Sequence, residues 1–296
     1  METLKVETIT PPRARRSWVV LDIESAVLDD TGHKRYQVME RWVPSDDKPI
    51  RRGYTRSEDP LTCPRWVFQT ITTAAVMVLS EDAQGGIDVD RFVTLSAPEQ
   101  NERAVLSGIL RVLAEAPRET EIVTWAGLAH DIPLLISGCM RHGLTLPPGW
   151  GWLMHGGFHK QRHLDLAHAF TGGMRMKPLH LSEVLAAMDI PGKLSCPPFA
   201  VAGLIVAGEW DKVKSACEID AISTACLLAR WRGLIDARVA ADAVEDRILR
   251  RVIKKRKDRD YIAALETHRR RRFAAAFARA ANDASTLAPW LDHDAA

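Results

Sequence analysis

Runs of apolar residues divide the first half of the chain into short strands. The continuous apolar run at Ser17–Ile23 leads into two acidic positions and predicts a buried strand. Segments rich in Val, Ile and Thr predict two more strands at Trp66–Leu79 and Ile87–Leu95, and Glu121–Trp125 predicts a fourth. Residues 26–62 are polar and rich in turn-forming residues, so we expect a long exposed loop there.

Helical spacing dominates the rest of the chain. Apolar residues three and four positions apart predict a helix within Pro98–Ala116, and an acid followed by a proline predicts a helix start at Asp131. The order of strands and helices favours an α/β domain with a mixed sheet. Helices are expected at 131–142, 181–188, 201–208 and 210–234, and almost continuously from 237 to about 281.

Composition is that of a globular protein: 46% of the 296 residues are hydrophobic and 26% are charged. We divide the chain into a disordered lead (1–16), a globular domain (17–236) and a basic helical extension (237–296). The five cysteines have no paired spacing, which indicates reduced thiols in a cytoplasmic protein. No secretory signal or membrane-spanning run is expected, so a membrane partner is excluded.

Positive charge is concentrated near the C-terminus. Residues 247–272 hold twelve Lys or Arg and three acids, a balance of +9, so the rest of the chain carries −7 of the net +2. Such a segment is typical of a polyanion-binding surface, and equally of a solvated helix face, and the sequence leaves both open. On the first interpretation Lys254, Lys255 and Arg256 are candidate nucleic-acid contacts.

Four acidic residues stand at positions where metal ligands can converge. Asp22 and Glu24 lie two apart at the end of a strand, so they share one face of the sheet and repel each other unless a cation lies between them. Asp131 follows a strand at a turn that Gly127 makes possible, although a helix N-cap is the alternative explanation. Asp220 interrupts an apolar helix. Each short motif recurs freely by itself, so only the combination is informative.

The local sequences around these acids resemble the DEDD superfamily of 3′→5′ exonucleases. They are VVLDIES (19–25), TWAGLAHDIPLL (124–135), HLSEVLAAMDIPGK (180–193) and GEWDKVKSACEIDAISTACLLARW (208–231). Within the superfamily the chain is similar to the predicted bacterial exonucleases related to the exonuclease domain of family B DNA polymerases. The resemblance extends over residues 17–235. It implies an RNase H-like α/β fold, with helices flanking a mixed sheet.

The resemblance also implies a reaction. Asp22, Glu24, Asp131 and Asp220 would be the catalytic metal ligands and would hold two Mg²⁺ or Mn²⁺ ions, which suit oxygen ligands. The ions would promote hydrolysis of phosphodiester bonds from the 3′ end of a single-stranded nucleic acid, with DNA favoured over RNA. Lys193 follows a glycine that the family also carries and is a candidate phosphate contact, or else a solvated lysine.

Four positions depart from the family pattern, and one of them is His130, which replaces a Phe of the second motif. Ala216 replaces the Tyr that orients the attacking water, Ser215 stands where a sister branch has His, and Ala126 replaces an Asn. One interpretation is an active exonuclease in which His130 or Glu218 assists. The second is a nucleic-acid-binding module that cleaves weakly or not at all, and the third is an interaction protein whose acids are incidental. Because all four acids are retained we favour the exonuclease. The sequence leaves the oligomeric state open.

Overall fold

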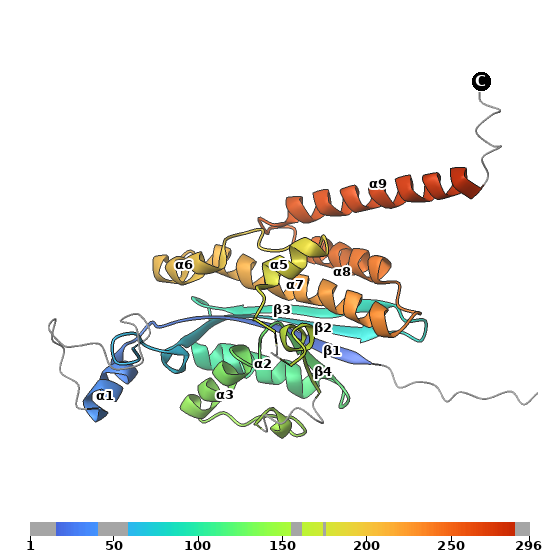
Figure 1. The fold of residues 1–296 in the computed structure, drawn as a ribbon. Coiled ribbons are helices and arrows are strands. Elements are labelled where there is room, and N and C mark those ends of the chain that lie inside the picture. The colour runs from blue at the N-terminus through green and yellow to red at the C-terminus, as the bar shows by residue number, and fades with distance from the viewer. Residues whose placement is uncertain (1–15, 41–58, 155–161, 174–175, 288–296) are drawn as a thin grey trace, which may run out of the picture.

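A five-stranded mixed sheet forms the centre of the computed structural model, which describes residues 16–40, 59–154, 162–173 and 176–287 (Figure 1). The strand order is β3-β2-β1-β4-β5; β1, β2 and β3 are antiparallel neighbours, whereas β4 and β5 run parallel to β1. This arrangement confirms the predicted RNase H-like α/β fold. All but the last residue of the predicted lead at 1–16 lies outside the described residues. The strands are β1 (Ser17–Ala26), β2 (Thr70–Glu81), β3 (Ile87–Ser96), β4 (Glu121–Thr124) and β5 (His163–Asp165).

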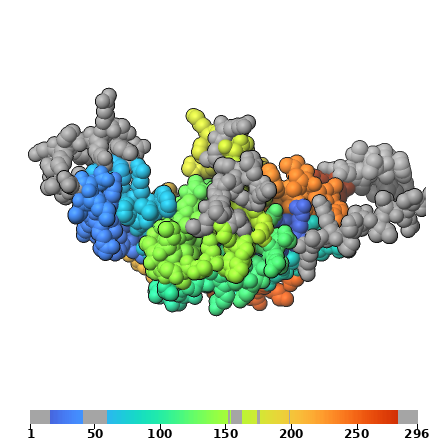
Figure 2. All heavy atoms as spheres, turned by 90° about the horizontal axis from the view of Figure 1, so that it is seen from below, coloured from blue at the N-terminus to red at the C-terminus, as the bar shows by residue number. Residues whose placement is uncertain are grey.

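Helices cover both faces of the sheet. In Figure 1 α2 and α3 lie below it, and α5, α7 and α8 lie above it. Figure 2 shows the molecule from below, with α2 and α3 in green over the middle and α1 in blue at one end. The helices are α1 (Thr31–Met39), α2 (Glu102–Glu115), α3 (Asp131–His142), α4 (Leu166–Phe170), α5 (Leu181–Ala187), α6 (Val201–Ala207), α7 (Trp210–Ile235), α8 (Ala241–Lys255) and α9 (Ile262–Leu287).

The two faces of β1 pack into separate cores. Val19 and Leu21 belong to the core that contains residues of α2 and α3, whereas Trp18 and Val20 belong to the core that contains residues of α5, α7 and α8. Side chains alternate between the faces of a strand, so an even-numbered residue that follows Val20 points toward α7. This alternation directs the acids at the end of β1 to the α7 side of the sheet.

The prediction of an exposed loop over residues 26–62 is wrong in part, because the chain forms α1 within it. Residues 41–58 lie outside the described residues. The helix has no long apolar stripe, and contacts with the returning chain hold it. His33 is buried, its Nε2 lies 2.7 Å from the Pro60 carbonyl oxygen, and its ring centroid is 5.3 Å from that of Phe68. The strand expected from Trp66 begins only at Thr70, after a short 3₁₀ turn.

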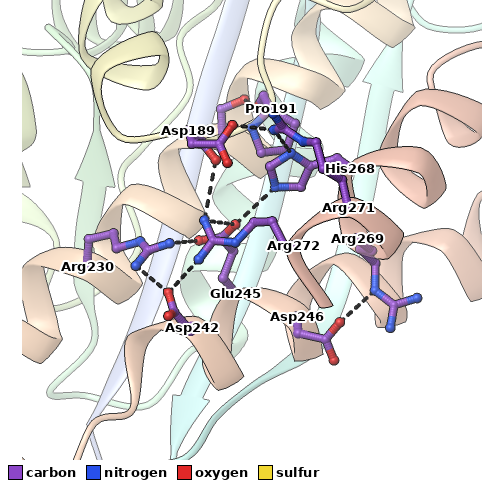
Figure 3. A network of polar contacts seen from close by, with 11 residues as sticks. Asp189, Pro191, Arg230, Asp242, Glu245, Asp246, His268, Arg269, Arg271 and Arg272 are labelled. Atoms are coloured by element: carbon purple, nitrogen blue, oxygen red, sulfur yellow. Dashed lines mark hydrogen bonds and ion pairs between the residues drawn. The ribbon is translucent and has the colours of Figure 1, made fainter. Parts of the chain in front are cut away.

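Ion pairs connect the basic extension to acidic residues of the domain and connect α9 to α8 (Figure 3). From α9, Arg271 pairs with Asp189 of the domain, just after α5, whereas Arg272 pairs within the extension, with Asp242 and Glu245 of α8. Residues of α8 also belong to the core above the sheet. Much of the positive charge counted from the sequence is therefore neutralised within the protein.

The sequence analysis expected no membrane-spanning segment and no disulfides. None of the helices in the described ranges combines the length and apolar character that a bilayer crossing requires. The five cysteines all lie in those ranges, and none of them forms a disulfide.

Candidate metal centre

Asp22, Glu24 and Asp220 converge at the end of β1. Each offers one carboxylate oxygen such that all three oxygens lie within 4.8 Å of one another. Asp22 and Glu24 come from the face of β1 that points to α7, and Asp220 comes from α7. A contact between the two elements supports the arrangement, because the Cys217 thiol donates to the Asp22 carbonyl oxygen at 3.3 Å. Three of the four acids identified from the sequence thus meet in one cluster.

Two oxygens of this cluster are buried without a hydrogen-bond partner. They are Asp22 Oδ2 and Asp220 Oδ1. Buried carboxylate oxygens are almost always satisfied, so an unsatisfied pair in one cluster calls for a ligand. A donor set made only of carboxylate oxygens suits a hard cation such as Mg²⁺ or Mn²⁺. The residues present therefore fit a divalent metal ion.

The cluster is electrostatically unfavourable without a cation. Burial raises the pKa of Glu24 from 4.5 to about 8, and the charges of Asp220 and Asp131 add to this rise. Burial also raises the pKa of Asp22 well above its ordinary value, with further contributions from Asp220, Glu24 and Asp131. Repulsion and lost hydration both disfavour ionisation, and a bound cation would counter both.

Asp131 lies at the first turn of α3, after a tight turn that begins at Ala126. Ala126 has a left-handed φ of 58°, which indicates why the related family can place an Asn there. A Cβ on Gly127 would lie 2.3 Å from Thr124 Oγ1, so this position requires glycine. Asp165 holds the turn in place, because its carboxylate accepts the backbone N–H groups of Ala126 and Leu128 at 2.9 Å each.

Asp165 is a supporting residue that the sequence analysis missed. It ends β5 and caps α4 by accepting from the His168 N–H at 3.2 Å. A three-residue strand is too short to give an apolar pattern. The only available signal was an Asp directly before the short helical segment 166–170, which is a common N-cap arrangement.

Asp131 stands outside the three-residue cluster but within its electrostatic reach. Its carboxyl is buried, and its charge contributes to the raised pKa of Asp22 and Glu24. Burial raises the pKa of Asp131 itself, and His130 opposes this rise. The His130 Nδ1 lies 3.3 Å from Asp131 Oδ1, and its side chain is 45% exposed. His130 is thus placed at the rim of the centre.

Lys193 lies inside the centre. Its ammonium forms an ion pair with Asp220 Oδ2, and its side chain is 23% exposed. A solvated lysine is therefore the wrong description. Contact with a phosphate remains a prediction for this residue.

Glu218 and Arg256 are engaged elsewhere. Glu218 is fully buried and accepts from Arg259 and from the Tyr261 hydroxyl, which joins α7 to the basic extension. Arg256 donates to the Phe92 carbonyl oxygen at 3.1 Å. The Glu218 carboxylate is thus occupied away from the three-residue cluster. Of the three candidate contacts near the end of α8, only Lys254 and Lys255 are exposed.

Ala216 faces an apolar environment. It is buried with Ala26, Val201, Ile205 and Val213, in a small core between α6 and α7.

Comparison with known proteins gives one family. A family model described as a predicted 3′-5′ exonuclease related to the exonuclease domain of PolB matches residues 64–268. The match contains Asp131, Lys193 and Asp220 and begins after Asp22 and Glu24. Among solved structures, a chain of an ExoI/SSB-Ct complex aligns with a TM-score of 0.34 and 10% identity, over 75% of this chain and 46% of that chain. This chain therefore spans less than half of that chain's length. No curated protein matches.

Proposed function

We propose, given that this chain belongs to the family of predicted 3′-5′ exonucleases related to the exonuclease domain of PolB, that it hydrolyses single-stranded nucleic acid from the 3′ end with divalent metal. The observation that carries the proposal is the meeting of Asp22, Glu24 and Asp220, with two buried oxygens that have no partner. DNA is the favoured substrate.

Each acid has a distinct place in the proposed centre. Asp22, Glu24 and Asp220 would hold one divalent ion, and Asp131, with Asp22, would hold a second. When bound, two such ions would supply Lewis acidity to the attacking water, the scissile phosphate and the leaving oxygen. The carboxylates would fix both positions in advance, because β1, α3 and α7 are anchored in the cores of the domain.

His130 is the proposed proton acceptor. Its imidazole lies at the rim beside Asp131 and is partly exposed, so it can receive a proton and pass it to solvent. Glu218 is no longer a candidate for this role, because Arg259 and Tyr261 occupy its carboxylate. His130→Gln should therefore lower kcat more than it raises KM.

A nucleic-acid-binding module with weak cleavage is the second candidate. Ala216 favours it, because a methyl side chain cannot orient an attacking water as the tyrosine of the related family does. The two functions make different predictions for one assay, since only the first shortens the strand.

The test uses single-stranded DNA and RNA oligonucleotides labelled at the 5′ or the 3′ end, incubated with Mg²⁺, Mn²⁺ or EDTA. We expect a ladder of shortened 5′-labelled DNA and early release of a labelled mononucleotide from the 3′ end. Asp220→Asn should abolish both. Asp211→Asn, on the same helix and 90% exposed, is the matched control and should leave them intact. Binding without shortening would favour the second candidate, and neither binding nor shortening would refute both.

A further inference from the structure

The turn that carries Lys193 is fixed onto α7. The Ser223 hydroxyl, one helical turn beyond Asp220, lies 2.7 Å from the Pro191 carbonyl oxygen and 2.6 Å from the Ile219 carbonyl oxygen of its own helix, and shares its one proton between the two. A Cβ on Gly192 would lie 2.2 Å from Leu185 Cδ1 and 3.3 Å from Ser223 Oγ, so the turn passes close to α5 and α7 here and a larger residue would displace the Leu185 side chain. Lys193 itself has a left-handed φ of 53°. A shared hydrogen bond, close packing at Gly192 and a left-handed backbone conformation together hold this lysine against α7.

The lysine side chain is directed into the carboxylate cluster. Its ammonium pairs with Asp220 Oδ2, and the Asp220 side chain is only 10% exposed. The carboxylates of Asp22 and Glu24 belong to the same cluster as Asp220. The side chain therefore carries a positive charge at the position where the acids need one.

This single charge satisfies only part of the cluster. The ammonium takes Asp220 Oδ2 and leaves Asp220 Oδ1 and Asp22 Oδ2 without partners. A divalent ion that used those two oxygens would bring a second positive charge close to Lys193. Two cations so close repel each other, so full occupation by metal disfavours the ion pair.

We propose that Lys193 is a tethered counter-cation: it neutralises Asp220 in the metal-free protein, competes with the divalent ion for that carboxylate, and is displaced when the ion binds. The inference rests on the proposed function only in taking the cluster to be a metal centre. Its consequence is that Lys193 weakens metal binding while it stabilises the protein without metal. A residue whose only role is to hold the fold would not have this pair of opposite effects.

The test is a titration with Mn²⁺ followed by electron paramagnetic resonance, on the full chain. Lys193→Met keeps a similar length and removes the charge, whereas Lys193→Arg keeps the charge. We expect Lys193→Met to bind Mn²⁺ roughly ten- to hundredfold more tightly, the size expected for loss of one competing charge-assisted contact. In EDTA the same variant should unfold at a lower temperature than the wild type, and Lys193→Arg should stay close to the wild type in both measurements.

Lys212→Met is the matched control, because this lysine lies on α7 itself, outside the carboxylate cluster, and is exposed in an ion pair with Glu209. It should change neither property. Unchanged or weaker Mn²⁺ binding by Lys193→Met, in a protein whose wild type binds Mn²⁺, would overturn the inference and leave the proposed function standing. If neither protein bound Mn²⁺, both would fail.

A second measurement needs no variant. Acetylation of lysines in the wild-type protein, followed by mass spectrometry, reports how accessible each ammonium is. Saturating Mg²⁺ should speed acetylation of Lys193 and leave Lys212 unchanged. An unchanged or slower reaction at Lys193 would contradict displacement, even if Lys193→Met did not fold.

Discussion

Replacement of Glu218 tests the distinction between a catalytic acid and an anchor for the basic extension. The carboxylate is fully buried, accepts from Arg259 Nε and Nη2 at 2.9 Å each, and accepts from the Tyr261 hydroxyl at 2.7 Å. Glu218→Gln removes the charge but keeps the shape, and leaves Arg259 with the exposed Asp211 carboxylate, 3.9 Å away, as a counter-charge. Removing one partner of a buried pair costs about 3–5 kcal/mol, and we expect the lower end, about 3 kcal/mol, because Arg259 is 15% exposed.

The assay is urea unfolding followed by tryptophan fluorescence. Arg259→Met and the double variant complete a mutant cycle, in which the double variant should lose much less than the sum of the single variants. Glu209→Gln, at an exposed ion pair where Glu209 is the N-cap residue of the same helix, is the control and should change the free energy of unfolding by less than about 1 kcal/mol. Mn²⁺ affinity should be unchanged in Glu218→Gln. Unchanged stability combined with lost cleavage would refute the reasoning and return Glu218 to a catalytic role.

Four further predictions concern the centre and the turn before Asp131. Ala126→Asn should raise the free energy of unfolding by about 0.5–1 kcal/mol, because Asn tolerates a left-handed φ better than Ala; a loss in thermal unfolding would contradict this. Asp165→Ala should weaken Mn²⁺ binding and lower kcat without a direct contact to metal, because it frees the turn before Asp131, and equal calorimetric affinities would argue against that support. Mn²⁺ affinity should rise from about pH 6 up to the raised Glu24 pKa of about 8, because the metal binds the ionised carboxylate. Below that pH, calorimetry should detect proton release when Mn²⁺ binds, and an affinity that does not change with pH would contradict the prediction. By the same linkage, the folded metal-free protein binds more protons at Glu24 than the unfolded chain does, so its stability should fall as pH rises from 4.5 to about 8.

The sequence predicted the acids of the centre because their positions follow from local patterns. Asp22 and Glu24 lie two residues apart at the end of an apolar strand, so their side chains share one face of the sheet. The strand-to-helix turn places Asp131 just beyond the carboxyl end of another strand. The α/β class followed from the same periodicities. The structure agrees with the sequence on the convergence of Asp22 and Glu24 with Asp220.

The sequence could not predict features that depend on contacts between distant segments. The helix α1 is held by His33 against Pro60 and Phe68, so its own pattern gives little signal. The ion pair between Lys193 and Asp220 depends on how the 191–193 turn packs against α7. The positive charge of the basic extension can be counted from the sequence. The pairing of its arginines with acidic residues of the domain depends on the tertiary structure.

The most direct test of the metal centre is anomalous diffraction from crystals soaked in Mn²⁺. The account predicts an anomalous peak within coordination distance, about 2.0–2.6 Å, of oxygens from Asp22, Glu24 and Asp220, with Lys193 moved away from Asp220. A second peak beside Asp131 would agree with a pair of ions. Well-ordered Mn²⁺ bound elsewhere in the crystal, with no peak among these carboxylates, would contradict the central claim.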